Sequence, residues 1–476
     1  MRVKITIFYR TTPPLYIGVF YACDIMAKNL LLFLAFCCII RFMKKTLGFC
    51  FLVSVGLGVS AQGELSSLNI GLDYRLRGVA IDNNDTQADT NDSLNYYSQQ
   101  ARVYMTGWLN ENVEASLRVQ SLNIWGLEGS TSPVTRYPAA DGSPWIENVY
   151  VNMPNLLNKH LKLVIGRQPI TLGDGLLVSD DRLGFNAVRA QVSLPKKMDL
   201  DLFTAKISEG LGTTKGDVDL NAAVWALEQG DNRWELGWVR EKDGGPNDYR
   251  LAKGTEPINS YSKNFYDLRL FGNLKDAYYK LEYIMQSGSA QQQNGETMDI
   301  TGDAQRIELG AQSDTERFGR FGVKTVYASG SGDDPASTNK DEGFRSSFSK
   351  QWDGLQRDGM GTHYGATLSD AYNPSAPFST QDTGLPLGAS GIKTLGLGLF
   401  TVQKIIWTGT LDYYIFDSRT KNNGKNSLGT ELDLGLNFRY TGYVTFALGA
   451  SYFFPGDLYE SANRVTRYSA ETHVHF

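Results

Sequence analysis

Arginine is the residue type whose placement could do chemistry in this sequence of 476 residues. Its guanidinium stays charged in any aqueous setting, and it binds a carboxylate through two parallel hydrogen bonds. In segments where apolar and polar residues alternate, seven arginines occupy polar positions: Arg75, Arg77, Arg102, Arg118, Arg189, Arg269 and Arg439. Such groups, spaced along one surface, could pass an anion from one to the next without a deep trap.

Acidic side chains occupy polar positions of the same kind and give a second interpretation. They are Asp73, Glu114, Glu282, Glu431 and Asp433. Each arginine could pair with one of these acids across neighbouring strands and so stiffen a wall. For any single arginine we favour this structural pairing, and for the whole set we favour some role in anion passage.

The elements that must position these residues alternate with a period of two. In TELDLGLNFRYTG, from Thr430 to Gly442, leucines and aromatics take every second place, and charged residues stand between them. Successive side chains of a strand point to opposite faces, so one face here is apolar and the other polar. In a soluble sandwich the apolar face would meet a core, whereas in a membrane barrel it would meet lipid and the polar face would line a lumen.

Alternating segments repeat along the chain, and most are as long as the roughly 10 residues that a tilted membrane strand needs. We predict 18 strands, near residues 66–79, 95–109, 112–124, 145–154, 160–169, 184–195, 198–207, 218–229, 232–241, 264–273, 276–286, 304–313, 316–329, 392–402, 404–418, 426–441, 443–454 and 464–476.

The connections between these segments fall into two classes that alternate. Turns of a few residues alternate with long polar loops, which include 80–94, 125–144, 242–263, 287–303 and 330–391. This order predicts an all-β, antiparallel barrel in the bacterial outer membrane, with short periplasmic turns and long extracellular loops. A soluble β-sandwich or β-solenoid is the alternative, but it would rarely keep two loop classes in strict order. A barrel of this size leaves a lumen too wide for side chains to fill, so water enters it.

The last segment, RYSAETHVHF, ends the chain on an aromatic residue, Phe476. A terminal aromatic on an alternating last strand is typical of bacterial outer-membrane barrels. We therefore expect two partners for folding: outer-membrane lipid, and the barrel assembly machinery through Phe476.

The first 61 residues have the features of export rather than of a folded domain. MKKTLGFCFLVSVGLGVSAQG begins at Met43 with a basic start, an apolar run and small residues before a cleavage site. Residues 43–61 are therefore predicted to be a secretory signal peptide, cleaved after Ala61. We interpret residues 1–42 as a mis-annotated N-terminal extension, with an unusually long signal sequence as the alternative, and residues 62–476 as the barrel.

The composition of residues 62–476 excludes several classes of protein. Removal of residues 1–61 takes away seven basic residues and one acid, which leaves 39 Lys and Arg against 50 Asp and Glu. This acidic balance argues against a nucleic-acid-binding surface. The last cysteine is Cys50, as expected for a chain that crosses an oxidising periplasm without disulfides. No apolar run near 18 residues follows Ala61, so we expect no transmembrane helix.

The longest loop, 330–391, is expected to have a function such as folding inward as a constriction. It contains Asp333, Asp334, Asp341, Glu342, Trp352 and His363. Its acids match no Ca²⁺-binding spacing, so we predict solvated carboxylates, with no metal and no cofactor. The sequence lacks the G-x-S-x-G motif of a lipase-type hydrolase. We expect wall hydrogen bonding from His473 and His475, with a serine hydrolase site there as the alternative, and predict no enzyme.

Several motifs, in order along the chain, resemble the alginate export family of outer-membrane barrels. They are NYYSQQARVYMTGWLNENVEASLRVQS, LKLVIGRQPITLGDGLLVSD, FNAVRAQV, YASGSGDDPASTNKDEGFRS and LGTELDLGLNFRYTGYVTFALGASYFFPGDLYE. The resemblance implies a barrel of 18 strands with arginines in its lumen and outward passage of an anionic polyuronate. It also implies an inward position for Arg167, which alternation alone puts on the apolar face. A β-bulge beside Gly166, or a place at the lumen edge, would turn Arg167 inward.

Two features depart from the family pattern. The short-side turns leave no room for the long periplasmic plug of the exporters, and lumen acids are plentiful. The resulting hypothesis is an outer-membrane channel for anionic or polar solutes, including an acidic polysaccharide. The alternatives are a general or substrate-specific uptake porin and, from another class, an adhesin or structural barrel whose long loops bind outside partners.

Overall fold

The computed structural model describes residues 66–84, 93–126, 141–157, 159–210, 217–245, 258–315, 319–334, 339–369, 385, 389–402, 406–459 and 463–476. The predicted extension, signal peptide and cleavage site lie outside these residues. Among the described residues, no helix is long and apolar enough to cross a membrane.

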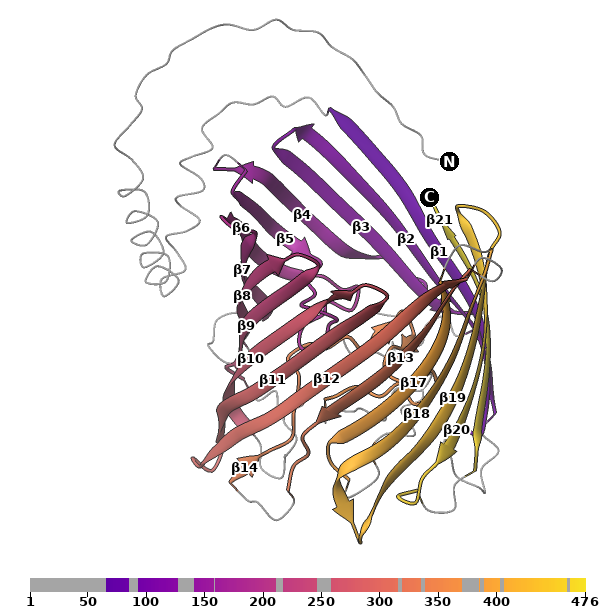
Figure 1. The fold of residues 1–476 in the computed structure, drawn as a ribbon. Helices are drawn as coiled ribbons and strands as arrows, with labels where there is room; N and C mark the ends of the chain where they lie inside the picture. The colour runs from indigo at the N-terminus through magenta and orange to yellow at the C-terminus, as the bar shows by residue number, and fades with distance from the viewer. Residues whose placement is uncertain are drawn as a thin grey trace, which may run out of the picture. The chain divides into compact units, whose positions relative to one another are not determined.

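Eighteen strands of the described chain form one closed antiparallel barrel (Figure 1). Each strand pairs with the next along the chain, and β1 closes the ring by pairing with both β2 and β21. The barrel strands are β1 (Ser67–Asp82), β2 (Leu94–Asn110), β3 (Val113–Ile124), β4 (Trp145–Leu156), β5 (Leu161–Gln168), β6 (Phe185–Leu194), β7 (Met198–Ser208), β8 (Val218–Gln229), β9 (Asn232–Asp243), β10 (Ile258–Leu274), β11 (Ala277–Gln292), β12 (Thr297–Thr315), β13 (Gly319–Gly330), β17 (Ile392–Val402), β18 (Trp407–Asn422), β19 (Lys425–Arg439), β20 (Val444–Pro455) and β21 (Val465–His475). The predicted all-β barrel is confirmed.

Three further strands are very short and lie in the connection between β13 and β17. β14 (Lys340–Asp341) runs parallel to β12, whereas β15 (Trp352–Asp353) and β16 (Gln356–Arg357) form a separate hairpin. β14 adds a short pairing to the edge of the sheet at β12, whereas β15 and β16 lie outside the barrel sheet.

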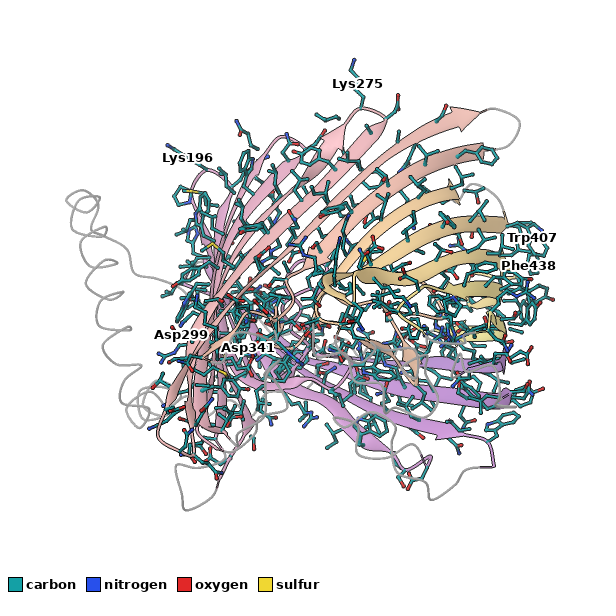
Figure 2. The ribbon with its side chains drawn as sticks, turned by 90° about the horizontal axis from the view of Figure 1, so that it is seen from below. Lys196, Lys275, Asp299, Asp341, Trp407 and Phe438 are labelled. Atoms are coloured by element: carbon teal, nitrogen blue, oxygen red, sulfur yellow. The ribbon has the colours of Figure 1, made fainter. Side chains whose placement is uncertain are left out.

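The alternation of apolar and charged residues sorts the side chains onto two faces, as predicted. On β19, Leu434 and Leu436 are exposed on the outer face, whereas Glu431 and Asp433 are buried on the inner face. An outer face rich in exposed leucine and aromatic residues suits lipid, and an inner face with charges suits a wet lumen. Trp407 and Phe438 pack on the outside with ring centroids 4.4 Å apart (Figure 2), as in an aromatic girdle.

One predicted loop, 287–303, is wrong. β11 and β12 continue through it and meet in a tight hairpin, where the backbone N–H of Gln292 donates to the carbonyl of Glu296 at 2.9 Å. Met298 and Ile300 on the extended strand are buried in a small cluster with residues of β10 and β11. The polar composition of this segment concealed its alternation, which Met298 and Ile300 continue.

The turns at the other end of the barrel are short, as predicted. Lys196 and Lys275 stand at the tips of two of them (Figure 2), and both have positive φ angles, of 63° and 57°. Left-handed backbone at these positions closes the hairpins within a few residues. We refer to this side as the short-turn end.

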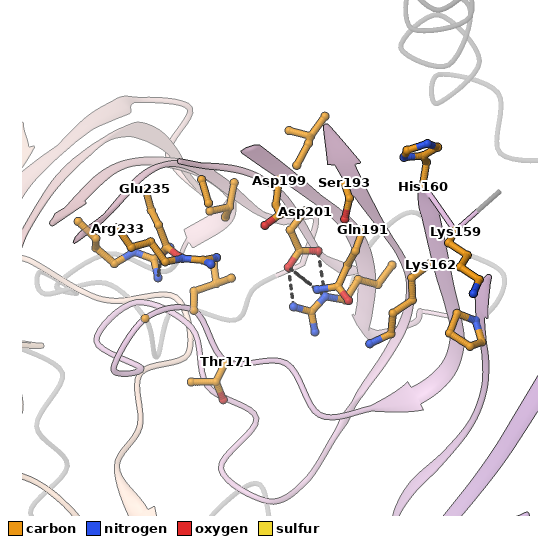
Figure 3. Close-up of a pocket in the computed structure, with 18 residues that line it drawn as sticks. Lys159, His160, Lys162, Thr171, Gln191, Ser193, Asp199, Asp201, Arg233 and Glu235 are labelled. Carbon is orange, nitrogen blue, oxygen red and sulfur yellow. Dashed lines mark hydrogen bonds and ion pairs between the residues drawn. The ribbon is translucent and has the colours of Figure 1, made fainter. Parts of the chain in front are cut away.

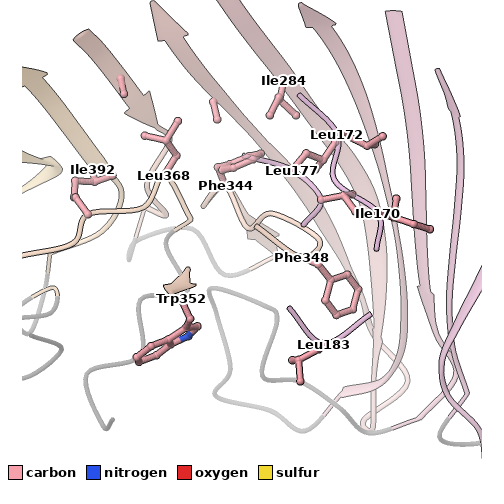
Figure 4. Close-up of a cluster of buried hydrophobic side chains, with 14 of the residues drawn as sticks. Ile170, Leu172, Leu177, Leu183, Ile284, Phe344, Phe348, Trp352, Leu368 and Ile392 are labelled. Carbon is pink, nitrogen blue, oxygen red and sulfur yellow. The ribbon is translucent and has the colours of Figure 1, made fainter. Parts of the chain in front are cut away.

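Two long connections fold into the barrel and pack on each other (Figure 4). We name residues 169–184, between β5 and β6, the first inward loop, and residues 339–369, between β13 and β17, the second inward loop. The backbone N–H of Phe348 donates to the carbonyl of Leu177 at 2.9 Å, and the N–H of Ser179 donates to that of Phe348 at 2.5 Å. The inward course of the second loop agrees with the prediction, whereas the first was not foreseen.

The second inward loop spans the lumen rather than lying on one wall. Phe344 packs on Phe265 of β10 with ring centroids 6.3 Å apart. Tyr364 packs on Phe416 of β18 at 4.7 Å and on Phe453 of β20 at 5.1 Å. Since the strands between β10 and β18 separate these contacts in the ring, the loop crosses the lumen and narrows any path through it.

Candidate functional site

Glu147 is the centre of the first charged cluster on the lumen wall. Arg102 approaches its two carboxylate oxygens at 2.6 and 2.9 Å, and Arg118 lies 3.2 Å from one of them. Arg102 also lies 3.4 Å from Asp73, which is 2.9 Å from the Nε2 of His473. Both predicted lumen arginines of this cluster are therefore held by acids.

A β-bulge in β4 brings Glu147 to this position. Ile146 and Val149 are both exposed on the outer face, so Glu147 and Asn148 between them both turn inward and are buried. The pairing of β4 with β3 shifts register at the same point. Glu147 was not among the predicted lumen acids, although strict alternation would have put its charge in lipid beside Val149. That conflict was a signal in the sequence, because a charge on the lipid face is costly.

A second cluster joins β1 to the tip of the second inward loop. Arg75 and Arg182 both contact the carboxylate of Asp353, and Arg77 lies 3.6 Å from it. Glu471 of β21 lies 3.2 Å from Arg75 and 2.5 Å from Arg77. Burial raises the pKa of Asp353, but the charges of Arg182, Arg75 and Arg77 outweigh burial and lower this pKa to about 2. Asp353 is therefore ionised at neutral pH.

A cavity of about 460 Å³ lies between the inner wall and the first inward loop (Figure 3). Arg189 lines it and donates through Nε to both oxygens of Asp201, at 2.9 and 3.1 Å. Arg269 lines it from β10 and lies 2.7 Å from Glu235. Lys162 also lines the cavity, and among the described residues it has no acid within ion-pair distance. The cavity thus brings together two predicted arginines and a lysine that the sequence analysis missed.

Arg167 has backbone partners instead of lumen acids. Its Nε donates to the carbonyls of Glu147 at 3.1 Å and Leu183 at 2.8 Å. Gly166 before it has a φ of 122°, and a Cβ there would lie 2.5 Å from the carbonyl oxygen of Val149. The register shift expected beside Gly166 lies instead at Glu147 on the neighbouring strand. Arg167 fastens the base of the first inward loop, so its part in a solute path stays a prediction.

Glu431 and Asp433 bind backbone groups of the second inward loop. Glu431 accepts hydrogen bonds from the N–H groups of His363 at 2.6 Å and Tyr364 at 2.9 Å, and Asp433 accepts one from Thr362 at 2.9 Å. The hypothesis that these two acids pair with the seven predicted arginines is wrong, because their carboxylates bind backbone N–H groups of the second inward loop instead. They anchor the loop to β19.

The remaining predicted residues are more dispersed. Glu282 is buried, with an arginine opposite it on each neighbouring strand. Glu114 lies 3.3 Å from the amide nitrogen of Asn152, which donates to it. Arg439 is exposed near the short-turn end of β19, and within the described chain it has no ion pair. The lumen arginines therefore form separate clusters instead of one continuous row.

Two of the acids singled out in the longest loop bind its own backbone. Asp333 and Asp341 accept hydrogen bonds from backbone N–H groups of the same loop, at 3.0 and 3.2 Å. Among the described residues, no group of three or more histidine, cysteine or acid side chains could hold a metal ion. His363 is fully buried, 5.5 Å from the ring of Phe453, and burial together with Arg467 lowers its pKa well below the usual range. These residues shape the loop and are not gathered around one point.

The N-terminal third of the barrel is similar to a known family. Residues 66–206 match the alginate export family. This alginate export match runs from the start of β1 into β7, so it includes the strands of Arg75, Arg77, Arg102, Arg118 and Arg189. No curated protein sequence matches the chain.

Solved structures extend the likeness over most of the chain. OccK9 (OpdG) of Pseudomonas aeruginosa is similar with a TM-score of 0.55 and 10% identity, covering 87% of this chain and 100% of that one. OccK8 (OprE) of the same organism is similar with a TM-score of 0.53 and 11% identity, covering 87% of this chain and 99% of that one. Acinetobacter baumannii OccAB4 is similar with a TM-score of 0.51 and 11% identity, covering 88% of this chain and 100% of that one. At these identities the likeness shows the fold. With the apolar outer face and the alginate export match, it places the chain in the bacterial outer membrane as a channel-type barrel.

Proposed function

We propose that the barrel is a passive channel for small acidic solutes, with carboxylate-bearing sugars as the substrate class. The observation that supports this most is the cavity beside the first inward loop. Five cations line it, against three acids: Lys159, Lys162, Arg189, Arg233 and Arg269 against Asp199, Asp201 and Glu235. Its volume of about 460 Å³ lies in the range of roughly 300–1,000 Å³ that small-molecule sites occupy.

The order of cations along the wall suits an anion that enters from the short-turn end. Lys159 lies in the turn before β5, and Lys162 follows at the second residue of that strand. Arg189 lies deeper, since it pairs with Val164, two residues further along the strand than Lys162. An ammonium near the entrance attracts a carboxylate, and the deeper guanidinium can bind it with two hydrogen bonds.

The two inward loops limit the size of the solutes that can pass through the barrel. They pack on each other, and the second is anchored by Glu431 and Asp433, so the path is narrower than the barrel. Single sugars and short oligosaccharides suit such a path. Neutral solutes would pass by diffusion alone, without the help of the cations.

Passage of a longer acidic polysaccharide is a second candidate, and the alginate export match favours it. Labelled oligouronates of increasing length, applied to proteoliposomes, separate the two. A sharp fall in flux beyond the first few sugar units supports the small-solute channel, whereas length-independent flux supports polysaccharide passage.

The flux of labelled glucuronate and glucose into proteoliposomes tests the proposed function. We expect glucuronate to enter faster than glucose, and Lys162→Gln to lower the glucuronate flux several-fold while glucose flux is unchanged. Lys196→Gln, at an exposed turn tip, is the matched control and should change neither flux. Equal flux of the two sugars in the wild-type channel would contradict the proposal.

A further inference from the structure

Three arginines converge on one carboxylate at the tip of the second inward loop. Arg75 contacts the Oδ2 of Asp353, Arg182 contacts Oδ1, and Arg77 lies 3.6 Å from Oδ2. Each carboxylate oxygen is thus in contact with a different guanidinium group, and contacts between opposite charges of this kind are stronger than those between neutral groups. The same arrangement would suit the carboxylate of a solute.

We propose that Arg75, Arg77 and Arg182 form a carboxylate-binding site for solutes, and that Asp353 occupies this site as an internal ligand. The inference rests on the proposed function, since it names one place where an acidic solute binds during passage. A solute carboxylate binds when it displaces Asp353, and Asp353 returns when the solute leaves.

The arginines are held in place by groups other than Asp353. Arg182 donates through Nη1 to the Oε1 of Gln100 at 2.7 Å, and Gln100 in turn donates to Gln120 at 2.6 Å. Both glutamines are buried. Arg182 also has a left-handed φ of 63°, which persists for a non-glycine residue when its surroundings fix it. Arg182 of the first inward loop is therefore fixed to the wall through Gln100.

Strand β1 fixes the other two arginines in the same way. Arg75 and Arg77 are two residues apart on β1 and so share the inner face. Glu471 on the paired strand β21 lies 3.2 Å from Arg75 and 2.5 Å from Arg77. The arginine cluster should keep its shape after Asp353 has left.

Removal of the Asp353 carboxylate leaves the cluster short of negative charge. Arg75, Arg77 and Arg182 bring three positive charges, and Glu471 then supplies one negative charge in direct contact. Partly buried cations repel each other more strongly than they would in water, because the surrounding dielectric constant is lower. An anion that enters the vacated position relieves this repulsion, so the site favours a replacement carboxylate.

The space around Asp353 makes the exchange mutually exclusive. The side chains of Asp353 and Arg182 are each 26% exposed, so solvent reaches them. The cavity between this hairpin and the wall has a volume of about 10 Å³, which is room for about one water molecule. A solute carboxylate therefore cannot bind beside Asp353 and has to replace it.

The tether of Asp353 to the loop sets the size of the effect. A ligand joined to its site by a short tether has an effective concentration of roughly millimolar or more. A free solute in the wild-type channel competes against that concentration. Without the Asp353 carboxylate, the apparent affinity for an acidic solute should rise at least about tenfold.

Asp353→Asn, compared with wild type in planar bilayers, tests this inference. The measured quantity is the glucuronate concentration that halves the single-channel ion current, and we expect it to be at least about tenfold lower in the variant. Adding Arg182→Gln to Asp353→Asn should remove the gain. Asp358→Asn is the control, because this substitution removes the same charge from the same loop. Asp358 pairs with Lys350 at 2.5 Å and not with the three arginines.

Asp353→Ser is a second variant, since it removes the charge without pointing amide N–H groups at the guanidinium donors. Equal half-blocking concentrations in wild type and both Asp353 variants, or the same gain in Asp358→Asn, would overturn the inference. Failure of both Asp353 variants to assemble would also overturn it, because an exchangeable ligand is dispensable for folding. Labelled-solute flux through wild type tests the proposed function separately, so the two failures are distinguishable.

Discussion

Arg102 and Arg118 share the buried carboxylate of Glu147. Replacing both arginines by alanine leaves that carboxylate without its cations inside the wall. Breaking a buried ion pair from one side costs about 3–5 kcal/mol, so we expect Arg102→Ala/Arg118→Ala to lower the free energy of unfolding by that amount. Urea titration of the barrel in lipid vesicles measures the loss.

The matching control also removes the carboxylate of Glu147, which the double variant leaves without its cations. Adding Glu147→Ala to the two arginine variants should restore most of the lost stability, because no unpaired buried charge then remains. A triple variant that is less stable than the double variant would show that Glu147 does not depend on these arginines.

Asp353 makes stability depend on pH in a defined window. Its pKa is lowered to about 2 in the folded barrel, so its ion pairs stabilise fully above the unfolded pKa near 4. That contribution is lost as the pH falls from about 4 through 2. We expect wild type to exceed Asp353→Asn in unfolding free energy by about 2 kcal/mol at pH 6 and by almost nothing at pH 2. Urea titrations at both pH values check this, and a difference that grows on acidification would contradict it.

Alternation alone placed the lumen arginines but missed several of their partners. Arg75, Arg102 and Arg189 stand where a period of two puts them, because strand geometry is local and regular. Glu147 was missed because a bulge interrupts the period, and Asp353 because it arrives from a loop more than 270 residues away from Arg75. Contacts of that kind depend on the whole fold and leave no periodic trace.

At the scale of the strand, the two faces of β19 should respond differently to the same new charge. Leu434 is exposed on the outer face, and Asn437 lies on the opposite parity. Leu434→Arg should cost roughly 2–4 kcal/mol near the bilayer midplane, whereas Asn437→Arg should cost little. Unfolding titrations in lipid vesicles compare them, and equal costs would mean that the assignment of faces is wrong.

The second inward loop depends on one glycine at its contact with β19. Gly361 has a φ of 83°, and a Cβ there would lie 2.5 Å from the Oε2 of Glu431. Gly361→Ala should strain this turn, loosen the hydrogen bonds to Glu431 and raise the single-channel conductance. Gly424→Ala is the control, since Gly424 has a φ of 82° but nothing within 4 Å of its added Cβ. Equal conductance of wild type and Gly361→Ala would show that the loop does not restrict the current.

Strands were easier to predict than loops for a physical reason. A strand of a membrane barrel faces lipid on one side and water on the other, so apolar and polar residues alternate along it. This alternation is visible in the sequence of the barrel strands. The first inward loop follows no such pattern, because Ile170, Leu172 and Leu177 are buried in a cluster that includes residues of the wall and of the second inward loop. The segment 287–303 was mistaken for a loop because serine and glutamine stand where leucine would mark the alternation at the ends of β11 and β12.

At the scale of the whole molecule, net charge and lumen charge are different quantities. The chain is acidic overall, with 51 Asp and Glu against 46 Lys and Arg. The field along a narrow, low-dielectric path is set by the few charges that line its tightest part. Those belong to the arginine clusters around Glu147 and Asp353 and to the cavity beside the first inward loop.

Ion selectivity tests the central claim most directly, because it reports the sign of the field at the constriction. The wild-type barrel in a planar bilayer is placed between two potassium chloride solutions of different concentration, and the reversal potential is measured. We expect a reversal potential whose sign shows that chloride passes in preference to potassium. A reversal potential of the opposite sign, showing preference for potassium, would contradict a channel for acidic solutes.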